Sequence, residues 1–530
     1  MHKRDASDAN HARENGNVRS LVDPRITENP WPLICLFATP LFAAVVLLMS
    51  PAAGAVIAFG IPAMTLLIRA PHCAALFTLL FLLLQDPLQI LAGGDGDVAL
   101  LVKRADEVLL LLLGCYCMIQ CRRVRAVLFG GKLGLGLAIC YGSLFASTIV
   151  ARPLPIAAAV DLALFSKPLL LLAVGIWLGP YAERIDAMLG RCLLVLMLTL
   201  ASSVVFLVKP ALLDAYLGDM GSTEIRLGFN VAQGVFLHPA TLAWVAVATF
   251  CLGYAAYLAY HKPAYLICAG LSAAIATLSW RRKSLAGLAL VVALSMCVSA
   301  SSRTRLRATI VAVLLCCVAA ILIGPYLLTM GQLTVEEYGF ADPYDTARSA
   351  LYYTSMLIAR DHFPLGSGLA SFGGFASMLF YSNTYYDYGL SFLNGVSKAS
   401  PAYVTDTFWP MVLGEGGIMC LGGYILIFVF LTKASWRRRG GGDQLPHVRM
   451  LALASLFLIG ASLCESTASH IYGSSLQAAL VFIPVGMLLG MCHLIESEGQ
   501  KFSTQQKMNG KESNRRTGAC SAVVGKLEDV

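Results

Sequence analysis

Charged residues make up only 13% of this 530-residue chain. A soluble chain would carry about twice that fraction, so an ordinary soluble domain is excluded. Hydrophobic residues make up 57%, and the mean hydropathy is +0.70. Apolar runs of about 20 residues recur along the chain, the length that a helix needs to cross a bilayer. The ten-residue alternating segments of a transmembrane barrel are missing. The composition therefore predicts an all-α polytopic membrane protein.

Metal-type cysteine pairs and nucleotide-binding loops are also missing. The 16 cysteines lie largely in apolar stretches, and none lies in the longest polar segment, 331–405. A disulfide framework is therefore not expected there. Asp95-Gly96-Asp97 matches a short acidic metal-holding motif of nucleotide-sugar transferases, but the soluble, strand-rich domain of those enzymes is absent, so we interpret it as a turn. No metal site and no cofactor are predicted. The net charge of +8 is attributed to loops facing anionic lipid headgroups, not to nucleic-acid binding.

About 14 spans are predicted, and basic loops orient them, since short cytoplasmic loops normally hold the Lys and Arg residues. Starting inside places both termini and the clusters near residues 122–125, 303–307 and 433–449 in the cytoplasm. The expected order is a cytoplasmic tail (1–30), spans 1 to 11 (31–330), a large outer loop (331–405), spans 12 to 14 (406–494) and a second cytoplasmic tail (495–530). The predicted spans are 31–50, 52–69, 72–92, 106–120, 125–150, 155–178, 188–213, 234–260, 263–280, 284–301, 308–330, 406–431, 449–470 and 473–494.

The large outer loop has its own expected structure. Apolar residues at helical spacing predict a helix over 346–359, with Asp342-Pro343 as a start signal and Pro364 with the following glycines as its end. An aromatic tract follows at 380–392. Aromatic rings at a membrane surface suit carbohydrate stacking or, equally, an interfacial aromatic belt.

Three consecutive cations, Arg281, Arg282 and Lys283, fall in a tight turn on the outer face, where the positive-inside rule does not expect them. Guanidinium groups are planar, permanently charged and suited to two-pronged phosphate recognition. The alternative is snorkelling of the side chains to lipid headgroups. An anionic ligand, with a lipid-linked pyrophosphate as the leading candidate, accounts for three cations in a row better than snorkelling does.

Further ionisable residues mark the outer face and the span ends. Asp406 lies where the large outer loop re-enters the membrane, as either a general base or an ordinary helix N-cap. Arg226 is either functional or paired with Glu224. Arg348 and Arg360 flank the expected outer helix, about three turns apart and on a similar face. Asp161 and Lys167 are expected to pair within one span. Additional intramembrane ionisable residues are Glu415, Glu465 and His470.

Four landmarks resemble, in order, the O-antigen ligase and polymerase (Wzy/WaaL-like) family of bacterial envelope enzymes. Segment 226–239 resembles an outer Arg before a Gly-Phe-His/Asn-Pro span entry, and segment 278–282 resembles a Leu-Thr-x-Ser-Arg turn. Segment 348–372 resembles a loop ending in His-Pro-Leu-x-Gly-x-Gly, and segment 406–417 resembles a closing Glu-x-Gly segment. One departure is that ligases of the family show His-Asn where this chain has Asp406-Thr407. That difference favours a polymerase branch.

The resemblance implies a metal-independent, GT-C-like membrane glycosyltransferase in the bacterial inner membrane, with its active site facing the periplasm. It implies polymerisation of undecaprenyl-pyrophosphate-linked repeat units, or transfer by a ligase to a lipid core or a protein. The donor and acceptor glycans and the bilayer are its partners, with a chain-length regulator and a flippase as further candidates. The implied catalytic residues are Asp406, Arg281 and Arg282. The implied substrate-binding residues are Arg226, Arg348, Arg360, His362 and His238. A transporter or a lipid-linked oligosaccharide flippase is the rival class, but the inverted repeat typical of transporters is not seen in the sequence.

Overall fold

The computed structural model describes residues 68–92, 97–218, 223–226, 228–298, 343–440 and 445–498. The chain divides into two compact units, Met1–Ala74 and Ala75–Val530, and apart from residues 68–74 everything described here belongs to the second. The predicted spans 31–50 and 308–330 lie outside the described residues, and 52–69 lies almost wholly outside them. The same holds for the basic cluster near 303–307 and for most of the Asp95-Gly96-Asp97 motif.

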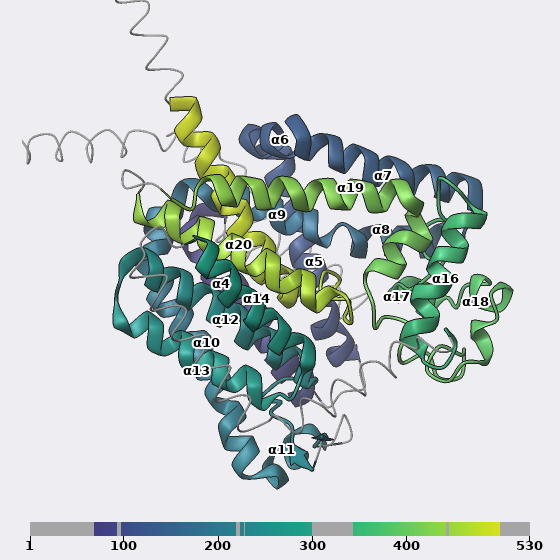
Figure 1. The fold of residues 1–530 in the computed structure, drawn as a ribbon, viewed down its shortest axis with the longest axis horizontal. Helices are drawn as coiled ribbons and strands as arrows, with labels where there is room; N and C mark the ends of the chain where they lie inside the picture. The colour runs from purple at the N-terminus through teal and green to yellow at the C-terminus, as the bar shows by residue number, and fades with distance from the viewer. Residues whose placement is uncertain are drawn as a thin grey trace, which may run out of the picture. The chain divides into compact units, whose positions relative to one another are not determined.

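The described residues are mostly helical, as the composition predicted (Figure 1). The helices of the first half are α4 (Pro71–Leu91), α5 (Asp97–Gln120), α6 (Arg122–Leu128), α7 (Gly131–Ala151), α8 (Pro155–Phe165), α9 (Lys167–Leu178), α10 (Ala182–Val208) and α11 (Pro210–Leu217). Those of the second half are α12 (Pro239–Tyr260), α13 (Pro263–Leu278), α14 (Arg282–Val298), α16 (Ala347–Asp361), α17 (Phe375–Leu379), α18 (Thr384–Asp387), α19 (Trp409–Arg437), α20 (Pro446–Ser466) and a last helix, Ser475–Glu498.

Seven helical segments in the described part of the chain are long and apolar enough to cross a membrane. They are 131–151, 155–181, 189–208, 239–260, 409–437, 446–466 and 475–498. The prediction of a helical membrane protein is confirmed at this level, whereas the count of 14 spans stays a prediction. The predicted span 155–178 is two helices, α8 and α9, which meet at Ser166. Pro168 in the first turn of α9 has no N–H to donate, so the helical ladder is interrupted there.

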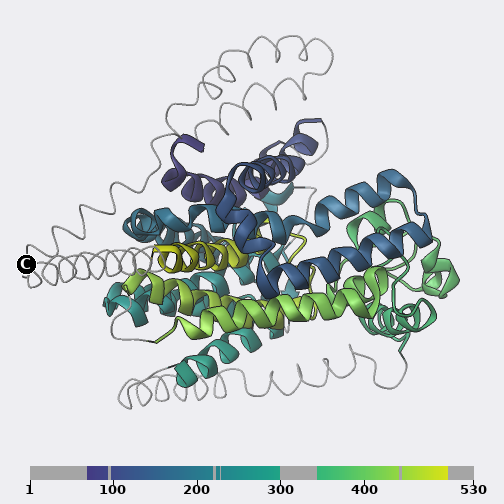
Figure 2. The same ribbon diagram turned by 90° about the horizontal axis from the view of Figure 1, so that it is seen from above.

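The long helices α7 and α19 run side by side in both views (Figures 1 and 2). α6, which contains Arg122 and Arg125, and the C-terminal end of α19, which contains Arg437, lie toward one end of this pair (Figure 1). The helices α16, α17 and α18 lie at the other end. The basic residues of α6 and of the C-terminal end of α19 are therefore at one end of the helix pair, and the helices of the segment 343–405 are at the other.

The helix predicted over 346–359 is confirmed as α16, although it begins later than the Asp342-Pro343 signal suggested. Thr346 is its N-cap, because the Thr346 hydroxyl accepts a hydrogen bond from the Ser349 backbone N–H at 3.2 Å. A side chain that satisfies a free N–H in the first turn fixes where a helix starts. The following loop carries the glycines that the sequence marked as the end of this helix.

The aromatic tract is not a single exposed surface. Tyr385 is fully buried, and its hydroxyl accepts a hydrogen bond from the Gly373 N–H at 2.8 Å. Tyr381 is also buried and donates to the carbonyl of Val396 at 3.0 Å. Both rings belong to the apolar core of the segment 343–405. Phe392, in contrast, is 92% exposed, so only part of the tract is available to a glycan or a membrane surface.

Candidate active site

The turn between α13 and α14 carries Arg281 at its tip. Trp280 adopts a positive φ of 51°, which is rare for a bulky side chain, and its ring stacks on that of Phe229 at 5.0 Å. The Ala232 N–H donates to the carbonyl of Leu278 at 3.1 Å. The turn is thus held against the short hairpin of β1 (Ile225–Arg226) and β2 (Phe229–Asn230), which brings two landmarks distant in sequence into contact.

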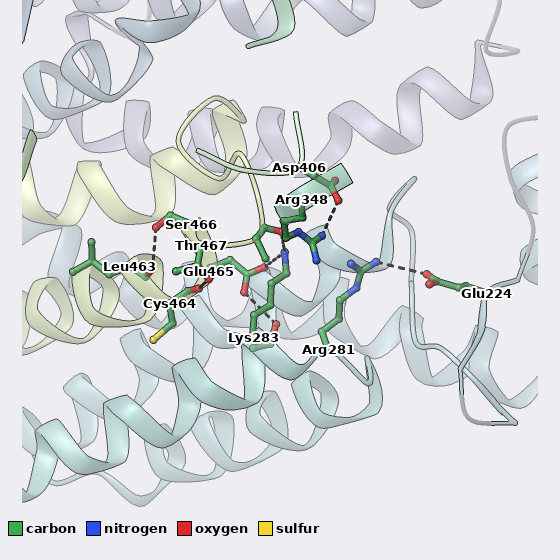
Figure 3. Close-up of polar contacts among 12 residues, drawn as sticks. Glu224, Arg281, Lys283, Arg348, Asp406, Leu463, Cys464, Glu465, Ser466 and Thr467 are labelled. Atoms are coloured by element: carbon green, nitrogen blue, oxygen red, sulfur yellow. Dashed lines mark hydrogen bonds and ion pairs between the residues drawn. The ribbon is translucent and has the colours of Figure 1, made fainter. Parts of the chain in front are cut away.

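Glu224, beside this hairpin, faces two arginines. Arg226 Nε donates to Glu224 Oε1 at 2.6 Å, which confirms the pairing considered for Arg226. Arg281 Nη2 lies 3.6 Å from Glu224 Oε2, and the Arg281 side chain is only 15% exposed (Figure 3). Burial lowers the pKa of Arg281, and the neighbouring Arg226 lowers it further, since both disfavour a charged guanidinium. A guanidinium stays charged in such surroundings, because arginine is not deprotonated in proteins.

Lys283 differs from Arg281 although the sequence groups them. Its ammonium lies 2.9 Å from Glu465 Oε1 and donates to the carbonyl of Ala468 at 2.9 Å. Glu465 is buried, and its second oxygen accepts from the Ser284 hydroxyl at 3.4 Å. Lys283 therefore ties α14 to the end of α20, and we assign it a structural role in place of the phosphate contact suggested by the three-cation run. Arg282 is the first residue of α14.

Arg348 and Asp406 form the other half of the site. Arg348, in the first turn of α16, donates through Nη2 to Asp406 Oδ2 at 2.7 Å (Figure 3). Helix α19 begins at Trp409 with Phe408 as its N-cap, so Asp406 is not the helix cap that was its alternative interpretation. A charge-assisted bond of this length fixes both side chains.

These contacts form one charged cluster, which we call the cation cluster: Arg226, Arg281, Lys283 and Arg348, with Glu224, Asp406 and Glu465. The charges of Glu465 and Asp406 both act on Arg281, and the charges of Arg281 and Arg348 both act on Lys283. His238 lies at its edge, at the N-cap of α12. Partial burial, followed by the charge of Arg281, lowers the pKa of His238 below its ordinary 6.5.

Two predicted site residues lie elsewhere. Arg360 is 73% exposed and pairs with Asp361 at 2.9 Å, and His362 follows as the C-cap of α16. The expectation that Arg348 and Arg360 share a face was wrong, because 12 residues at about 100° each leave them roughly 120° apart. At about 1.5 Å per residue they are also roughly 18 Å apart along the helix.

A kink in α19 positions the loop between α16 and α17. Gly417 has a positive φ of 71°, which breaks the helical ladder. The carbonyls of Gly414 and Glu415, released by the break, accept hydrogen bonds from the N–H groups of Ser367 (2.8 Å) and Gly368 (3.0 Å). The two landmarks near 361–368 and 414–417 therefore interlock through their backbones.

Buried carboxylates complete this junction, a role that the sequence did not indicate. Asp161 Oδ2 accepts from the Ala370 N–H at 2.9 Å, and Glu415 Oε1 accepts from the Phe372 N–H at 3.1 Å. The expected pairing of Asp161 with Lys167 was wrong: Lys167 instead contacts Glu107 at 3.1 Å. Asp161 lies in α8, whereas Lys167 begins α9 beyond the break at Ser166, so the two side chains face different neighbours.

In the described part of the chain, no three His, Cys, Asp or Glu side chains gather as a metal-binding group. A comparison with models of known protein families and one with curated protein sequences give no match. The fold defines a helical protein with helices long and apolar enough to cross a membrane, and the cation cluster is the most distinctive polar feature of the described residues.

Proposed function

We propose that this protein is a membrane glycosyltransferase that polymerises undecaprenyl-pyrophosphate-linked oligosaccharide repeat units into a surface polysaccharide. The reaction takes place at the periplasmic face of the bacterial inner membrane. An acceptor hydroxyl attacks the anomeric carbon of the donor glycan, and the lipid pyrophosphate leaves. The transfer of finished polymer by a ligase is the alternative within the same class.

The observation that carries this proposal is the convergence of Arg226, Arg281 and Arg348 on one site. These residues come from a hairpin, an interhelical turn and a helix of the large loop, and each lay in a separate landmark of the sequence. Concentrating positive charge among apolar helices is costly unless carboxylates or an anionic ligand offset it. A pyrophosphate supplies such a charge, and the site lies beside the start of α12 and the end of α20, two helices long and apolar enough to cross a membrane.

The cluster would act on the leaving group. Negative charge grows on the departing pyrophosphate oxygen in the transition state, and cations already in place stabilise that state more than the ground state. Arg281 and Arg348 are the candidates to contact the pyrophosphate, with Arg226 holding Glu224. Asp406 orients Arg348 and borders the position of the acceptor.

Deletion of the gene, followed by analysis of the surface glycan, tests this proposal. Loss of long chains with single repeats retained indicates a polymerase, whereas finished chains accumulating on undecaprenyl pyrophosphate indicate a ligase. Unchanged surface glycan, in length and in attachment, would contradict both.

Complementation then tests the cluster. Arg281→Ala should abolish chain extension, while Arg360→Ala, which removes the same kind of side chain far from the cluster, should retain it. Both variants are first shown to reach wild-type membrane levels. Wild-type chain lengths with Arg281→Ala would refute the role of the cluster.

A further inference from the structure

The three carboxylates of the cation cluster and His238 at its edge could each accept a proton from an acceptor hydroxyl. Each carboxylate already has a cationic partner: Arg226 for Glu224 at 2.6 Å, Lys283 for Glu465 at 2.9 Å and Arg348 for Asp406 at 2.7 Å. His238 is partly exposed at the N-cap of α12. A general base must be reachable by the substrate, so these surroundings distinguish His238 from the carboxylates.

The backbone on the N-terminal side of His238 is held by side-chain hydrogen bonds. Gln233 Nε2 donates to the carbonyls of Phe236 (3.0 Å) and Leu237 (2.8 Å), and the Leu237 N–H donates to Asp86 Oδ2 at 3.1 Å. Bonds of this kind leave the backbone of residues 236–238 little freedom. A side chain that follows such a segment is pre-positioned, which is what a catalytic group requires.

The charged groups that face His238 come from several elements. They are Arg281 in the turn before α14, Lys283 in α14, Glu224 beside the hairpin and Asp406 before α19. The two cations disfavour a protonated imidazole and the two carboxylates favour it, and with partial burial the net effect is a lowered pKa. A lowered pKa favours the neutral imidazole, the form that can take up a proton.

We propose that His238 is the proton acceptor in the proposed glycosyl transfer and that Asp406 is a positioning residue acting through Arg348. The acceptor oxygen forms a bond to the anomeric carbon as the bond from that carbon to the pyrophosphate oxygen breaks. The electron pair of the broken bond leaves with the pyrophosphate, which the cations receive. The hydroxyl proton passes to an imidazole nitrogen and from there to solvent. This assignment rests on the proposed function.

The test uses the full-length protein in lipid nanodiscs, with undecaprenyl-pyrophosphate-linked repeat units isolated from the native source. His238→Ala should lower the rate of chain extension on the order of 100- to 10,000-fold. Added imidazole should restore part of that rate, because it can replace the missing base. The wild-type rate should fall as pH drops through a value below 6.5. His261→Asn, at the C-cap of the same helix α12, is the matched control and should keep the wild-type rate.

The outcomes are distinguishable. Chain extension by His238→Ala at the wild-type rate would overturn the assignment of the base and leave the proposed function standing. His238→Ala could instead be inactive with wild-type thermal stability, show no rescue by imidazole and keep the wild-type pH profile in its residual activity. That result would overturn the assignment of the base and indicate that His238 binds substrate. A wild-type protein inactive on these lipids would overturn the proposed function as well. Imidazole rescue together with an active His261→Asn control supports the proposal.

Discussion

The ion pair between Lys283 and Glu465 gives the most direct test of how the site is built. Both side chains are largely buried, with 14% and 2% exposed, and they lie 2.9 Å apart. Removing one partner of a buried pair leaves an uncompensated charge, which costs about 3–5 kcal/mol of stability. We expect Lys283→Met and Glu465→Gln each to destabilise the protein by that amount. The double variant has no unpaired charge at this position and should be destabilised by less than the sum of the two, the difference being the coupling energy of the pair.

The assay is denaturant-induced unfolding of the purified proteins in mixed micelles, carried out for the wild type, both single variants and the double variant. A coupling energy of about 0.5–3 kcal/mol is expected for residues in direct contact. Asp361→Asn removes the exposed carboxylate of the Arg360–Asp361 pair and serves as a control that should leave the unfolding midpoint unchanged. Additive losses in the double variant would refute the pairing, as would wild-type midpoints in both single variants.

Three further predictions concern the kink, the site and the pH response. Gly417→Ala should destabilise the protein, because Gly417 has a φ of 71° and an added Cβ would lie 2.2 Å from the backbone of the loop. Gly422→Ala, in the same helix, meets open space and should leave the stability unchanged. Thermal unfolding of the two variants tests this difference. Arg348→Ala removes the 2.7 Å contact and Asp406→Asn removes its negative charge, so both should abolish long chains on a glycan gel; normal polymer in both would contradict this role. Burial, followed by the charge of Lys167, lowers the pKa of His470 from 6.5 to about 4. Between these two values only the unfolded chain takes up the proton, so the free energy of unfolding should fall as pH drops from 6.5 to 4. His470→Gln should flatten this dependence in unfolding measurements at pH 4 to 7.

The helical elements were largely predictable from the sequence, because their signals are local. Apolar runs predicted spans at 234–260 and 263–280, where the structure has α12 (Pro239–Tyr260) and α13 (Pro263–Leu278). α16 was also predictable, although its start depends on the side chain of Thr346 and not on the nearby proline. The break between α8 and α9 was missed, although Pro168 signals it, because the apolar residues on both sides were combined into one predicted span.

The membership of the cation cluster was only partly predictable. Arg226, Arg281, Arg348 and Asp406 were marked individually, and the structure brings them together. The partners of Lys283 and Asp161 could not be found, because helix rotation and long-range packing decide which side chains meet. Arg360 and His362 belong to the same sequence landmark as Arg348, the segment 348–372. The length and rotation of α16 place them away from the site.

The contacts within the cluster also indicate where an anion would enter. Three of its ion pairs are close, at 2.6 Å for Arg226 with Glu224, 2.9 Å for Lys283 and 2.7 Å for Arg348. The contact of Arg281 with Glu224 is longer, at 3.6 Å, and Glu224 already has Arg226 as its nearer partner. Coulomb attraction falls with distance, and Glu224 is 35% exposed to water, so exchanging this contact for a ligand costs the least. Arg281 also has a buried Nε without a hydrogen-bond partner among the described residues. An incoming pyrophosphate would therefore replace Glu224 as the partner of Arg281 before it disturbed the other ion pairs. Arg226 would continue to neutralise Glu224 during this exchange.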